Sequence, residues 1–492
     1  MAYKGMREFL EVLEAEGELM HITEPVDWNV QIGATSRRLC DLETNGTPVP
    51  AVMFENIKDY PGGRFFTNSL ASWRRYALAL GLPKDTSRMD IVEAFYQRVK
   101  TPIPPVVLDK ADALCKENIL LGDDIDVTKF PAPQWHAQDG NRFLGTFHAF
   151  INKDLDSDWV NWGMYRVAIH DKKTIGINIP PGMMNHAHII HKGYIEKNMR
   201  MPVAVVMGDC PTLPIVSAAN FPAGVNEVEY AGALRQAPFE LVKAETNDLL
   251  VPAHAEIVIE GYIDPGELRD EGPFGEYTGY YAGGRHPKPV IHVTCITHRN
   301  DPILIGSQEG VPLVDDHYMA GISMSALARQ VLLDTVKVPG VKKVFYHPEA
   351  NWAFCVVSVE KAFDGHANTI AQAIWSSRCG SSVGFADFIV VVDHDIDPSN
   401  LTQVLWALAG RCNPIEDMQF VRNKGFANFL DPKIPLADRK KLISSSGVVI
   451  DAAWKYEWRV SAPENIPPVS NWEDWAEPVR RFAADLVDRN LT

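Results

Sequence analysis

The 492-residue sequence has no apolar run of the roughly 18 residues that a membrane-spanning helix needs. Its first residues, Met1-Ala-Tyr-Lys-Gly-Met-Arg-Glu, lack the apolar segment of a signal peptide. No basic run is longer than Arg439-Lys440-Lys441, and 63 acidic residues against 47 basic ones give a net charge of −16. Such a charge repels nucleic-acid phosphates. We therefore expect a cytoplasmic protein with no membrane span and no nucleic-acid partner.

The sequence also lacks clustered cysteines. Its cysteines number seven, lie far apart and form no Cys-x-x-Cys motif. This spacing argues against a disulfide framework and against a zinc knuckle. Cys295 and Cys355 lie in apolar, strand-like runs, where a free cysteine is usually a core residue.

The composition is that of a globular protein, with 46% hydrophobic and 22% charged residues. Helical and strand patterns alternate up to a proline-rich break at 100–110, a β-rich stretch follows from Phe143, and an apolar helix is expected over Met324–Val336. We predict an α/β (α+β) fold. Its parts are an N-terminal α/β lobe at 1–110, a central β-rich sheet or barrel-like domain at 111–322, a linking helix at 323–338, a C-terminal α/β domain at 339–462 and a tail helix at 463–492.

The hexapeptide Glu271-Gly-Pro-Phe-Gly-Glu276 places two carboxylates five residues apart around a turn. Proline fixes φ and glycine reaches conformations closed to other residues, so the segment can bend both carboxylates into one cavity. Two carboxylates held together cannot both ionise easily, and one then becomes a proton donor near neutral pH. A surface turn with two solvated glutamates is the alternative, and the hexapeptide alone leaves both open.

Three further patches carry ligand-type side chains. Asn161 and Arg166 enter one strand, where the arginine offers a fixed fork for a carboxylate and the asparagine an amide oxygen for a metal. His186 and its neighbours at 188 and 191 do not share a helix face, which argues against a three-histidine zinc site. Glu240 lies among apolar residues, so it either faces solvent or binds a cation. Each patch also has a purely structural reading.

These patches, taken in chain order, resemble the UbiD family of prenylated-FMN-dependent decarboxylases. The resemblance covers nearly the whole chain. The matching pieces are Asn161-Trp162-x3-Arg166, Ile179-Pro-Pro with His186, Tyr230-x-Gly-Ala-Leu234, Glu240-Leu-Val-Lys243, Thr246-Asn-Asp-Leu-x-Val-Pro-Ala253, Glu256-Ile-Val-Ile-Glu-Gly261, Glu271-Gly-Pro-Phe-Gly-Glu276, Asp395-Ile-Asp397 and Val404-Leu-Trp406-Ala.

The resemblance implies a catalytic triad of Arg166, Glu271 and Glu276. It implies a divalent ion, typically Mn²⁺, that ties the cofactor phosphate to Asn161, His186 and Glu240, with His188 as the alternative to His186. It further implies a monovalent ion such as K⁺ at Trp162, Ala218, Ala219, Phe221 and Glu240.

The resemblance also implies two sets of residues around the flavin and the substrate. The expected cofactor contacts are Asn161, Trp162, Gly163, Met164, Tyr165, Arg166, Pro181, His186, Glu240 and Arg378. The expected substrate wall includes His317, Tyr318, Phe426 and Asn428, which could equally be packing residues.

The activity implied is reversible, non-oxidative decarboxylation of an aromatic, heteroaromatic or aryl-unsaturated acid through a covalent adduct with prenylated FMN, in which Glu276 delivers the proton. The implied partners are the aromatic acid, CO₂, a flavin prenyltransferase that supplies the cofactor, and further copies of the chain in a homodimer or homohexamer. The alternatives are a prenylquinone-pathway decarboxylase of the 4-hydroxybenzoate type, a metal-dependent hydrolase using Asn161, His186 and Glu240, and a noncatalytic flavin-binding subunit.

Overall fold

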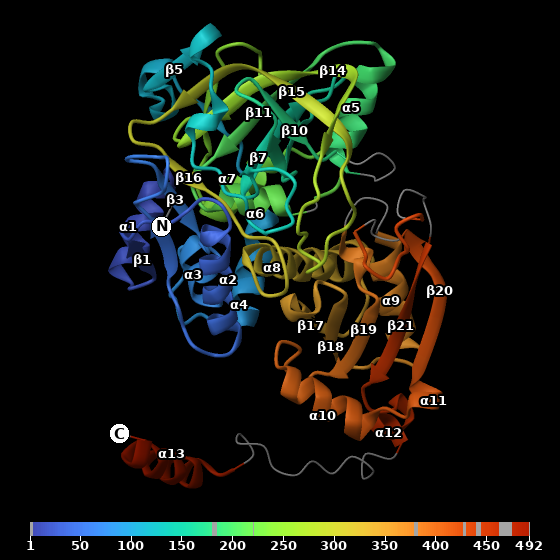
Figure 1. The fold of residues 1–492 in the computed structure, drawn as a ribbon. Helices are drawn as coiled ribbons and strands as arrows, with labels where there is room; N and C mark the ends of the chain where they lie inside the picture. Colours follow the sequence, from blue (N-terminus) through green and yellow to red (C-terminus); the bar gives the residue numbers. More distant parts are fainter. Residues whose placement is uncertain are drawn as a thin grey trace.

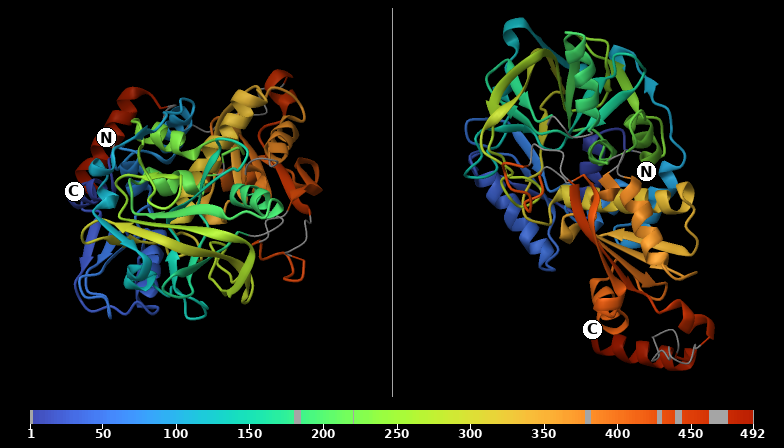
Figure 2. Two further views of the ribbon diagram at one scale, coloured as in Figure 1. Left: turned by 90° about the horizontal axis from the view of Figure 1, so that it is seen from above. Right: turned by 90° about the vertical axis from the view of Figure 1, so that its right-hand side faces the viewer.

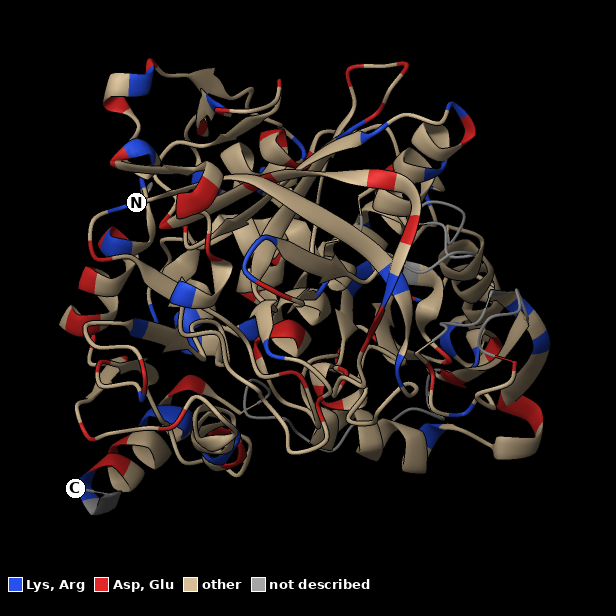
Figure 3. Ribbon diagram, turned by 45° about the horizontal axis from the view of Figure 1, so that its top comes forward, with Lys and Arg blue, Asp and Glu red and all other residues tan. Residues whose placement is uncertain are grey.

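The computed structural model describes residues 3–179, 185–219, 221–377, 382–426, 430–438, 444–461 and 475–491. The fold is mixed α/β. A central sheet lies above an N-terminal lobe and a C-terminal domain, and helix α8 runs between the two lower parts (Figure 1). Within these ranges, no helix has both the length and the apolar character needed to cross a membrane. Figure 3 shows acidic and basic residues interspersed along the elements.

The N-terminal lobe is built on a four-stranded sheet of order β1-β2-β3-β16. Its first helix buries an apolar stripe of Met6, Phe9, Leu10 and Leu13, which lie at helical spacing. Strand β16 comes from residues 303–305 and pairs in parallel with β3, so the fourth strand enters from much later in the chain. The lobe consists of α1 (Met6–Ala15), β1 (Leu19–Ile22), α2 (Gln31–Thr44), β2 (Ala51–Phe54), β3 (Arg64–Thr67), α3 (Trp73–Ala79), α4 (Arg88–Val99) and β16 (Ile303–Ile305).

The central domain holds a nine-stranded sheet in which eight strands follow the order β6-β9-β10-β15-β14-β11-β7-β8 and β5 pairs with β15. The expected β-rich domain is therefore present. In the part of the chain described, this sheet has two ends and does not close into a barrel. Its strands are β5 (Asn118–Leu121), β6 (Phe143–Gly145), β7 (His148–Lys153), β8 (Val160–Gly163), β9 (Val167–Ile169), β10 (Thr174–Ile177), β11 (Met201–Met207), β14 (Ile257–Glu271) and β15 (His286–His298).

Three helices and a smaller sheet complete the central domain. The small sheet has the order β13-β12-β4. Helix α6 contacts both the central sheet and α8, and α7 contacts α6 and β8. These elements are β4 (Val106–Val107), α5 (His186–Glu196), α6 (Thr212–Ala218), α7 (Glu227–Arg235), β12 (Glu240–Lys243) and β13 (Leu250–Pro252).

The linking helix begins earlier than expected. Helix α8 spans Asp315–Gln330 and continues as a π turn over Val331–Thr335, whereas the apolar pattern predicted a start near Met324. Its first turn carries acidic residues and a histidine, and His317 caps the helix by accepting the Val314 N–H at Nδ1. Polar capping residues hide a helix start from an apolar pattern.

The C-terminal domain has a five-stranded sheet of order β17-β18-β19-β21-β20, with β18, β19 and β21 parallel. Alternate strand residues face opposite layers, so Val357 and Val391 join the main core while Val356 and Val390 form a second core with α10. Its elements are β17 (Val341–Tyr346), β18 (Phe354–Val359), α9 (His366–Ser376), β19 (Phe388–Asp393), α10 (Leu401–Arg411), α11 (Pro414–Asp417), β20 (Met418–Phe426), β21 (Ser444–Ala452) and α12 (Tyr456–Ser461).

The expected tail helix is α13 (Glu477–Leu491). The right-hand view of Figure 2 shows it at the opposite end of the molecule from the central sheet. Its apolar residues Val479, Phe482 and Leu486 are exposed by 47%, 66% and 50%. The helix therefore presents an apolar face to solvent.

Candidate active site

The hexapeptide lies at the end of the longest strand of the central sheet. Strand β14 runs for 15 residues and ends at Glu271, opposite His286 of β15. The chain then makes a tight turn in which the Gly279 N–H donates to the Glu276 carbonyl at 2.9 Å and the Glu276 N–H donates to the Tyr280 carbonyl at 3.2 Å. Both glutamates are buried, so the surface-turn alternative is wrong.

Arg166 joins the two carboxylates. Its Nε donates to Glu271 Oε1 at 2.9 Å, and its NH1 contacts Glu276 Oε1. The arginine side chain is only 12% exposed, and its guanidinium carbon lies 4.9 Å from the centre of the Phe274 ring. The three residues of the predicted triad therefore form one buried cluster from two distant segments.

Neighbouring backbone holds the turn against the sheet. The Gly275 N–H donates to Asp139 Oδ1 at 3.0 Å, and the Gly272 N–H donates to Asn141 Oδ1 at 3.1 Å. Gly140 passes so close that a Cβ on it would lie 1.9 Å from the Gly272 carbonyl oxygen. Only glycine fits at residue 140, which fixes the start of the turn.

Burial raises the pKa of Glu276, and the Arg166 charge opposes this shift while the Glu271 charge adds to it. Burial alone would lower the pKa of Arg166, but the charges of Glu276 and Glu271 more than offset burial and the pKa is raised. The cluster therefore keeps a charged arginine beside a carboxyl group that retains its proton to higher pH than a solvated glutamate.

Two more acids, Glu309 and Asp316, lie within electrostatic range of Glu276. Burial, together with the charges of Asp316 and Glu276, raises the pKa of Glu309 well above its usual value. Burial and the charges of Asp315 and Glu276 raise the pKa of Asp316 to about 7. Among the described residues around Glu276, carboxyl groups outnumber arginines. This shortage of positive charge favours carboxyl groups that keep their protons.

A second group of residues surrounds a buried carboxylate on α7. Glu227 is 2% exposed; His186 Nδ1 lies 3.1 Å from its Oε1, and the Trp162 N–H donates to its Oε2 at 2.9 Å. Asn161, in the same strand as Trp162, is 1% exposed and donates to Asn152. His186 on α5 and Glu227 on α7 are therefore in contact, and Asn161 on β8 directly precedes the residue whose N–H binds Glu227.

The predicted ligand Glu240 does not join this group. Its carboxylate contacts His254 Nε2 instead, at the start of β12. The Glu240 carboxylate is partly buried, and His254 supplies the partner that it needs there. Glu227 takes the place beside His186 that the sequence reading gave to Glu240. One sequence signal could have identified Glu227. It lies three residues before Tyr230, one turn earlier on the same helix, and Tyr230 begins one of the segments that match the family.

The donor set around Glu227 fits a divalent cation. Among the residues described, no lysine or arginine forms an ion pair with Glu227, so its buried charge lacks a full counter-charge. The oxygen and nitrogen donors of Asn161, His186 and Glu227 are the mixed, hard set that suits Mn²⁺ or Mg²⁺. His188, the alternative ligand, is half-buried, and burial lowers its pKa.

Other expected cofactor contacts lie around this group. The Met164 N–H donates to the Ser217 carbonyl at 2.9 Å, which sets Gly163, Met164 and Tyr165 beside the end of α6. Ala218 and Ala219 form that helix end, and Phe221 stacks on Tyr230 of α7 at 4.2 Å. Pro181 and Arg378 lie outside the described residues.

Two residues of the expected substrate wall, His317 and Tyr318, have described side chains. His317 accepts from the Val314 N–H and donates from Nε2 to the Tyr277 carbonyl at 2.8 Å, so both ring nitrogens bind backbone. Tyr318 packs edge-on against Trp73 of the N-terminal lobe, 5.2 Å between ring centres. These contacts favour the packing alternative for both residues. Asn428 and the side chain of Phe426 lie outside the described residues.

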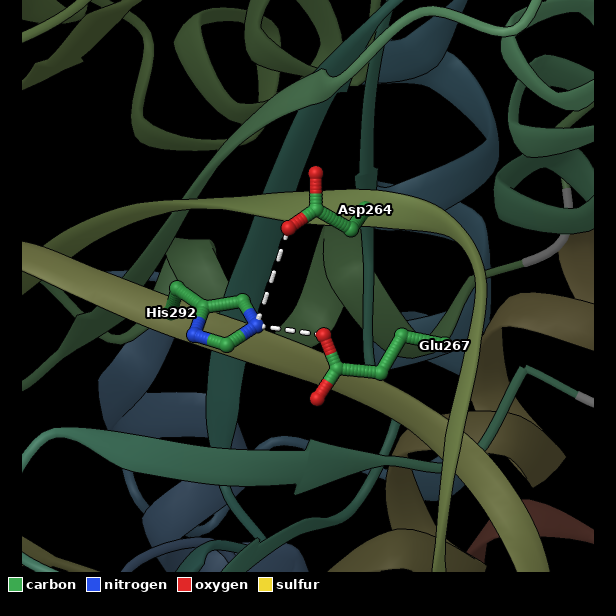
Figure 4. A group of neighbouring side chains, drawn as sticks. All are labelled: Asp264, Glu267 and His292. Carbon is green, nitrogen blue, oxygen red and sulfur yellow. Dashed lines mark hydrogen bonds and ion pairs between the residues drawn. The ribbon is translucent and has the colours of Figure 1, made fainter.

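A separate cluster of Asp264, Glu267 and His292 on β14 and β15 also has metal-type side chains (Figure 4). His292 Nε2 lies 2.6 Å from Glu267, but Arg200 binds Asp264 at 2.7 Å and Arg269 lies 3.7 Å from Glu267. All three side chains are partly exposed. The arginines already balance the two carboxylates, so this cluster reads as a surface ion-pair network.

Comparison with known proteins identifies the family. Family models of 3-octaprenyl-4-hydroxybenzoate carboxy-lyase match the chain in three consecutive parts: the N-terminal domain over residues 10–95, the Rift-related domain over 106–312 and the C-terminal domain over 317–452. A phenolic acid decarboxylase from Streptomyces sp. is 30% identical over 99% of this chain and 100% of its own length. A pyrrole-2-carboxylic acid decarboxylase from Pseudomonas aeruginosa is 32% identical over 90% of this chain and 89% of its own.

Solved structures agree. The vanillic acid decarboxylase of Sedimentibacter hydroxybenzoicus in its closed form has a TM-score of 0.85 and 30% identity, with 100% of both chains covered. An evolved dimeric form of a UbiD-class enzyme from Pelotomaculum thermopropionicum, in complex with prFMN, has a TM-score of 0.78 and 29% identity, with 95% of this chain and 97% of that chain covered. The chain therefore belongs to the UbiD family and is a carboxy-lyase.

Proposed function

We propose that the chain catalyses the reversible, non-oxidative decarboxylation of an aromatic or heteroaromatic acid with prenylated FMN as cofactor. The observation that carries the proposal is the buried Arg166–Glu271–Glu276 cluster at the end of β14. Relatives that cover nearly the whole chain act on phenolic and pyrrole carboxylic acids, which supports an aromatic ring in the substrate.

The chain's own part in the reaction is proton delivery. Loss of CO₂ leaves an electron pair on the former carboxyl carbon, and the prenylated flavin, when bound, supplies a covalent electron sink for that pair. Glu276 carries the proton that the carbon then receives, because burial raises its pKa. Arg166 orients the carboxyl group, and Glu271 holds Arg166 from the other side.

Asn161, His186 and Glu227 are proposed to hold the divalent ion, Mn²⁺ by family, that binds the cofactor phosphate. This assignment replaces Glu240 with Glu227 and rests on the contacts of Glu227 with His186 and the Trp162 N–H. Backbone carbonyls near Trp162, Ala218, Ala219 and Phe221 are proposed to hold K⁺. The hydrolase alternative would use the same donor set without a flavin, so an active, flavin-free preparation would favour it.

A homo-oligomer is proposed as the working form. Large apolar side chains on the C-terminal domain are exposed, among them Trp406 at 59%, Ile415 at 93% and Phe420 at 80%, besides those of α13. Exposed apolar groups of this density are typical of interaction surfaces. One related structure is described as an evolved dimeric form.

The decisive test is co-expression with a flavin prenyltransferase, followed by an absorbance spectrum of the purified protein and a screen of phenolic, heteroaromatic and cinnamic-type acids for CO₂ release. We expect a modified flavin and turnover of at least one aromatic acid. A protein that binds no flavin, or that releases CO₂ from none of these acids with the flavin bound, would refute the proposal. Activity of this chain alone also excludes a noncatalytic subunit.

A further inference from the structure

Tyr277, the residue after Glu276, is contacted by the C-terminal domain. Its ring stacks on the indole of Trp352, with 4.2 Å between ring centres and 20° between ring planes. Trp352 is 9% exposed and lies just before β18, so it belongs to a different domain from the catalytic turn. The contact therefore joins two domains one residue away from the proposed proton donor.

The loop that carries Trp352 adopts an unusual backbone. Asn351 and Trp352 have φ angles of 54° and 65°, in the left-handed region. Asparagine tolerates this region, whereas a bulky residue such as tryptophan rarely adopts it. Such a conformation persists only where the surroundings hold it. Here the buried stack with Tyr277 is part of what holds it.

The linking helix fixes the backbone of the same residue. His317 at the start of α8 donates from Nε2 to the Tyr277 carbonyl at 2.8 Å and accepts the Val314 N–H at Nδ1. Burial lowers the pKa of His317 to about 4, so the ring stays neutral near pH 7 and this donor–acceptor pattern persists. Tyr277 is therefore held by its carbonyl from α8 and by its ring from the C-terminal domain.

A movement of Tyr277 must move Glu276. The two residues are adjacent in a turn closed by the Gly279 N–H to Glu276 carbonyl bond at 2.9 Å and by the Glu276 N–H to Tyr280 carbonyl bond at 3.2 Å. The side chain of Glu276 meets Arg166 on the central domain. General acid catalysis depends on placement of the acid to within a fraction of an ångström.

We propose that Trp352 is a positioning residue whose indole fixes the ring of Tyr277 and thereby holds the Glu276 carboxyl group in place for proton delivery. This inference rests on the proposed role of Glu276. It makes the packing of the C-terminal domain on the catalytic turn a condition for protonation of the product.

The first test compares Trp352→Ala and Trp352→Phe with Phe363→Ala, whose ring is also in the C-terminal domain but packs on His366. In the flavin-loaded enzyme we expect Trp352→Ala to lower kcat by at least about tenfold and to change KM by less than about threefold, since the acid is displaced while substrate contacts remain. Trp352→Phe keeps an aromatic partner and should recover most of kcat, and Phe363→Ala should match the wild type.

The second test needs no catalysis. Amide hydrogen exchange of peptides spanning residues 272–281 is expected to be faster in Trp352→Ala than in the wild type and close to the wild type in Trp352→Phe. An unchanged kcat and unchanged exchange in Trp352→Ala would overturn the inference, as would a loss that Trp352→Phe does not recover. If the wild type decarboxylates no acid, the proposed function fails, and the exchange comparison still decides whether Trp352 holds the turn.

Discussion

Two clusters of arginine and carboxylate side chains serve different ends in this protein. In the central domain, the single Arg166 faces Glu271 and Glu276. In the C-terminal domain, Arg411 binds Asp393 at 3.1 Å and Asp395 at 2.7 Å, and Arg459 contacts Asp393 as well. Both clusters join strand ends to neighbouring segments, but only the second has as many arginines as carboxylates.

This difference in charge balance shifts the pKa values in opposite directions. Burial raises the pKa of Glu276 despite Arg166, because one guanidinium is shared by two carboxylates. Burial would also raise the pKa of Asp395, but the hydrogen bonds and charge of Arg411 outweigh it and the pKa is lowered. A balanced cluster stays ionised and ties segments together, whereas a cluster short of positive charge keeps a proton that chemistry can use.

The largest expected effect separates these two roles. Glu276→Gln removes the proton donor and should lower kcat by about 100-fold or more, the usual scale of general acid catalysis, with little loss of stability. Asp393→Asn removes a buried partner of two arginines and should lower the free energy of unfolding by about 3 kcal/mol while kcat per folded molecule stays near that of the wild type. Turnover and denaturant unfolding of both variants measure this. Full turnover in Glu276→Gln would contradict the catalytic role of the Arg166 cluster.

Two histidine–glutamate pairs also differ in their proposed roles, since one would bind a metal and the other would not. Glu227 pairs with His186 at the proposed metal group, and Glu240 pairs with His254 away from it. We expect Glu227→Ala to lose bound manganese and, with it, the flavin, because it removes the only carboxylate of the proposed donor set. Glu240→Ala should keep both. Metal analysis and flavin absorbance of the purified variants test this, and an equal metal content in the two variants would contradict our choice of Glu227.

The pH dependence of turnover sharpens the comparison further. Burial raises the pKa of Glu276, and kcat for decarboxylation should fall as pH rises through that pKa, because the proton donor is then lost. The charge of Arg166 lowers this pKa; Arg166→Gln should therefore move the alkaline limb to higher pH, besides lowering kcat, whereas Arg166→Lys should leave the limb nearer its original place. A pH–rate profile of the wild type and of each variant tests this. If the alkaline limb lies at the same pH in all three proteins, the group that titrates there is not Glu276.

The smallest expected effect concerns Asp316. Burial and the charges of Asp315 and Glu276 raise the folded-state pKa of Asp316 from its ordinary value of 3.8 to about 7, so the folded state holds this proton more tightly than the unfolded chain. The stability that results is complete below pH 3.8 and is lost as pH rises to about 7. Asp316→Asn should therefore melt at a slightly higher temperature than the wild type at pH 8, with a smaller difference at pH 5. An equal or lower melting temperature at pH 8 would indicate that Asp316 is solvated.

Most elements could be predicted from the sequence, because they depend on local patterns. The stripe on α1, the strands β1, β2 and β3, and the bend at Gly272-Pro273 follow from residue spacing and backbone preference. The resemblance then joined Arg166 to the two glutamates, which spacing alone could not do.

Other assignments could not be made from the sequence. Glu240 and Glu227 are both acids near apolar residues, and only the packing of α7 against β8 shows which one meets His186. The sequence left His317 open between a substrate contact and a packing residue, and in the structure its ring caps α8 and binds the Tyr277 carbonyl. Such choices depend on long-range contacts, which a local pattern does not contain.

Strand β16 has a consequence for how the protein is made. Residues 303–305 complete the N-terminal sheet by pairing in parallel with β3 at residues 64–66. During synthesis, the first hundred residues therefore leave the ribosome without their edge strand, and the lobe cannot finish folding until the central domain has been translated. A fragment that ends at the proline-rich break is expected to expose the edge of β3 and to aggregate. The N-terminal lobe is therefore a distinct part of the structure that cannot fold independently.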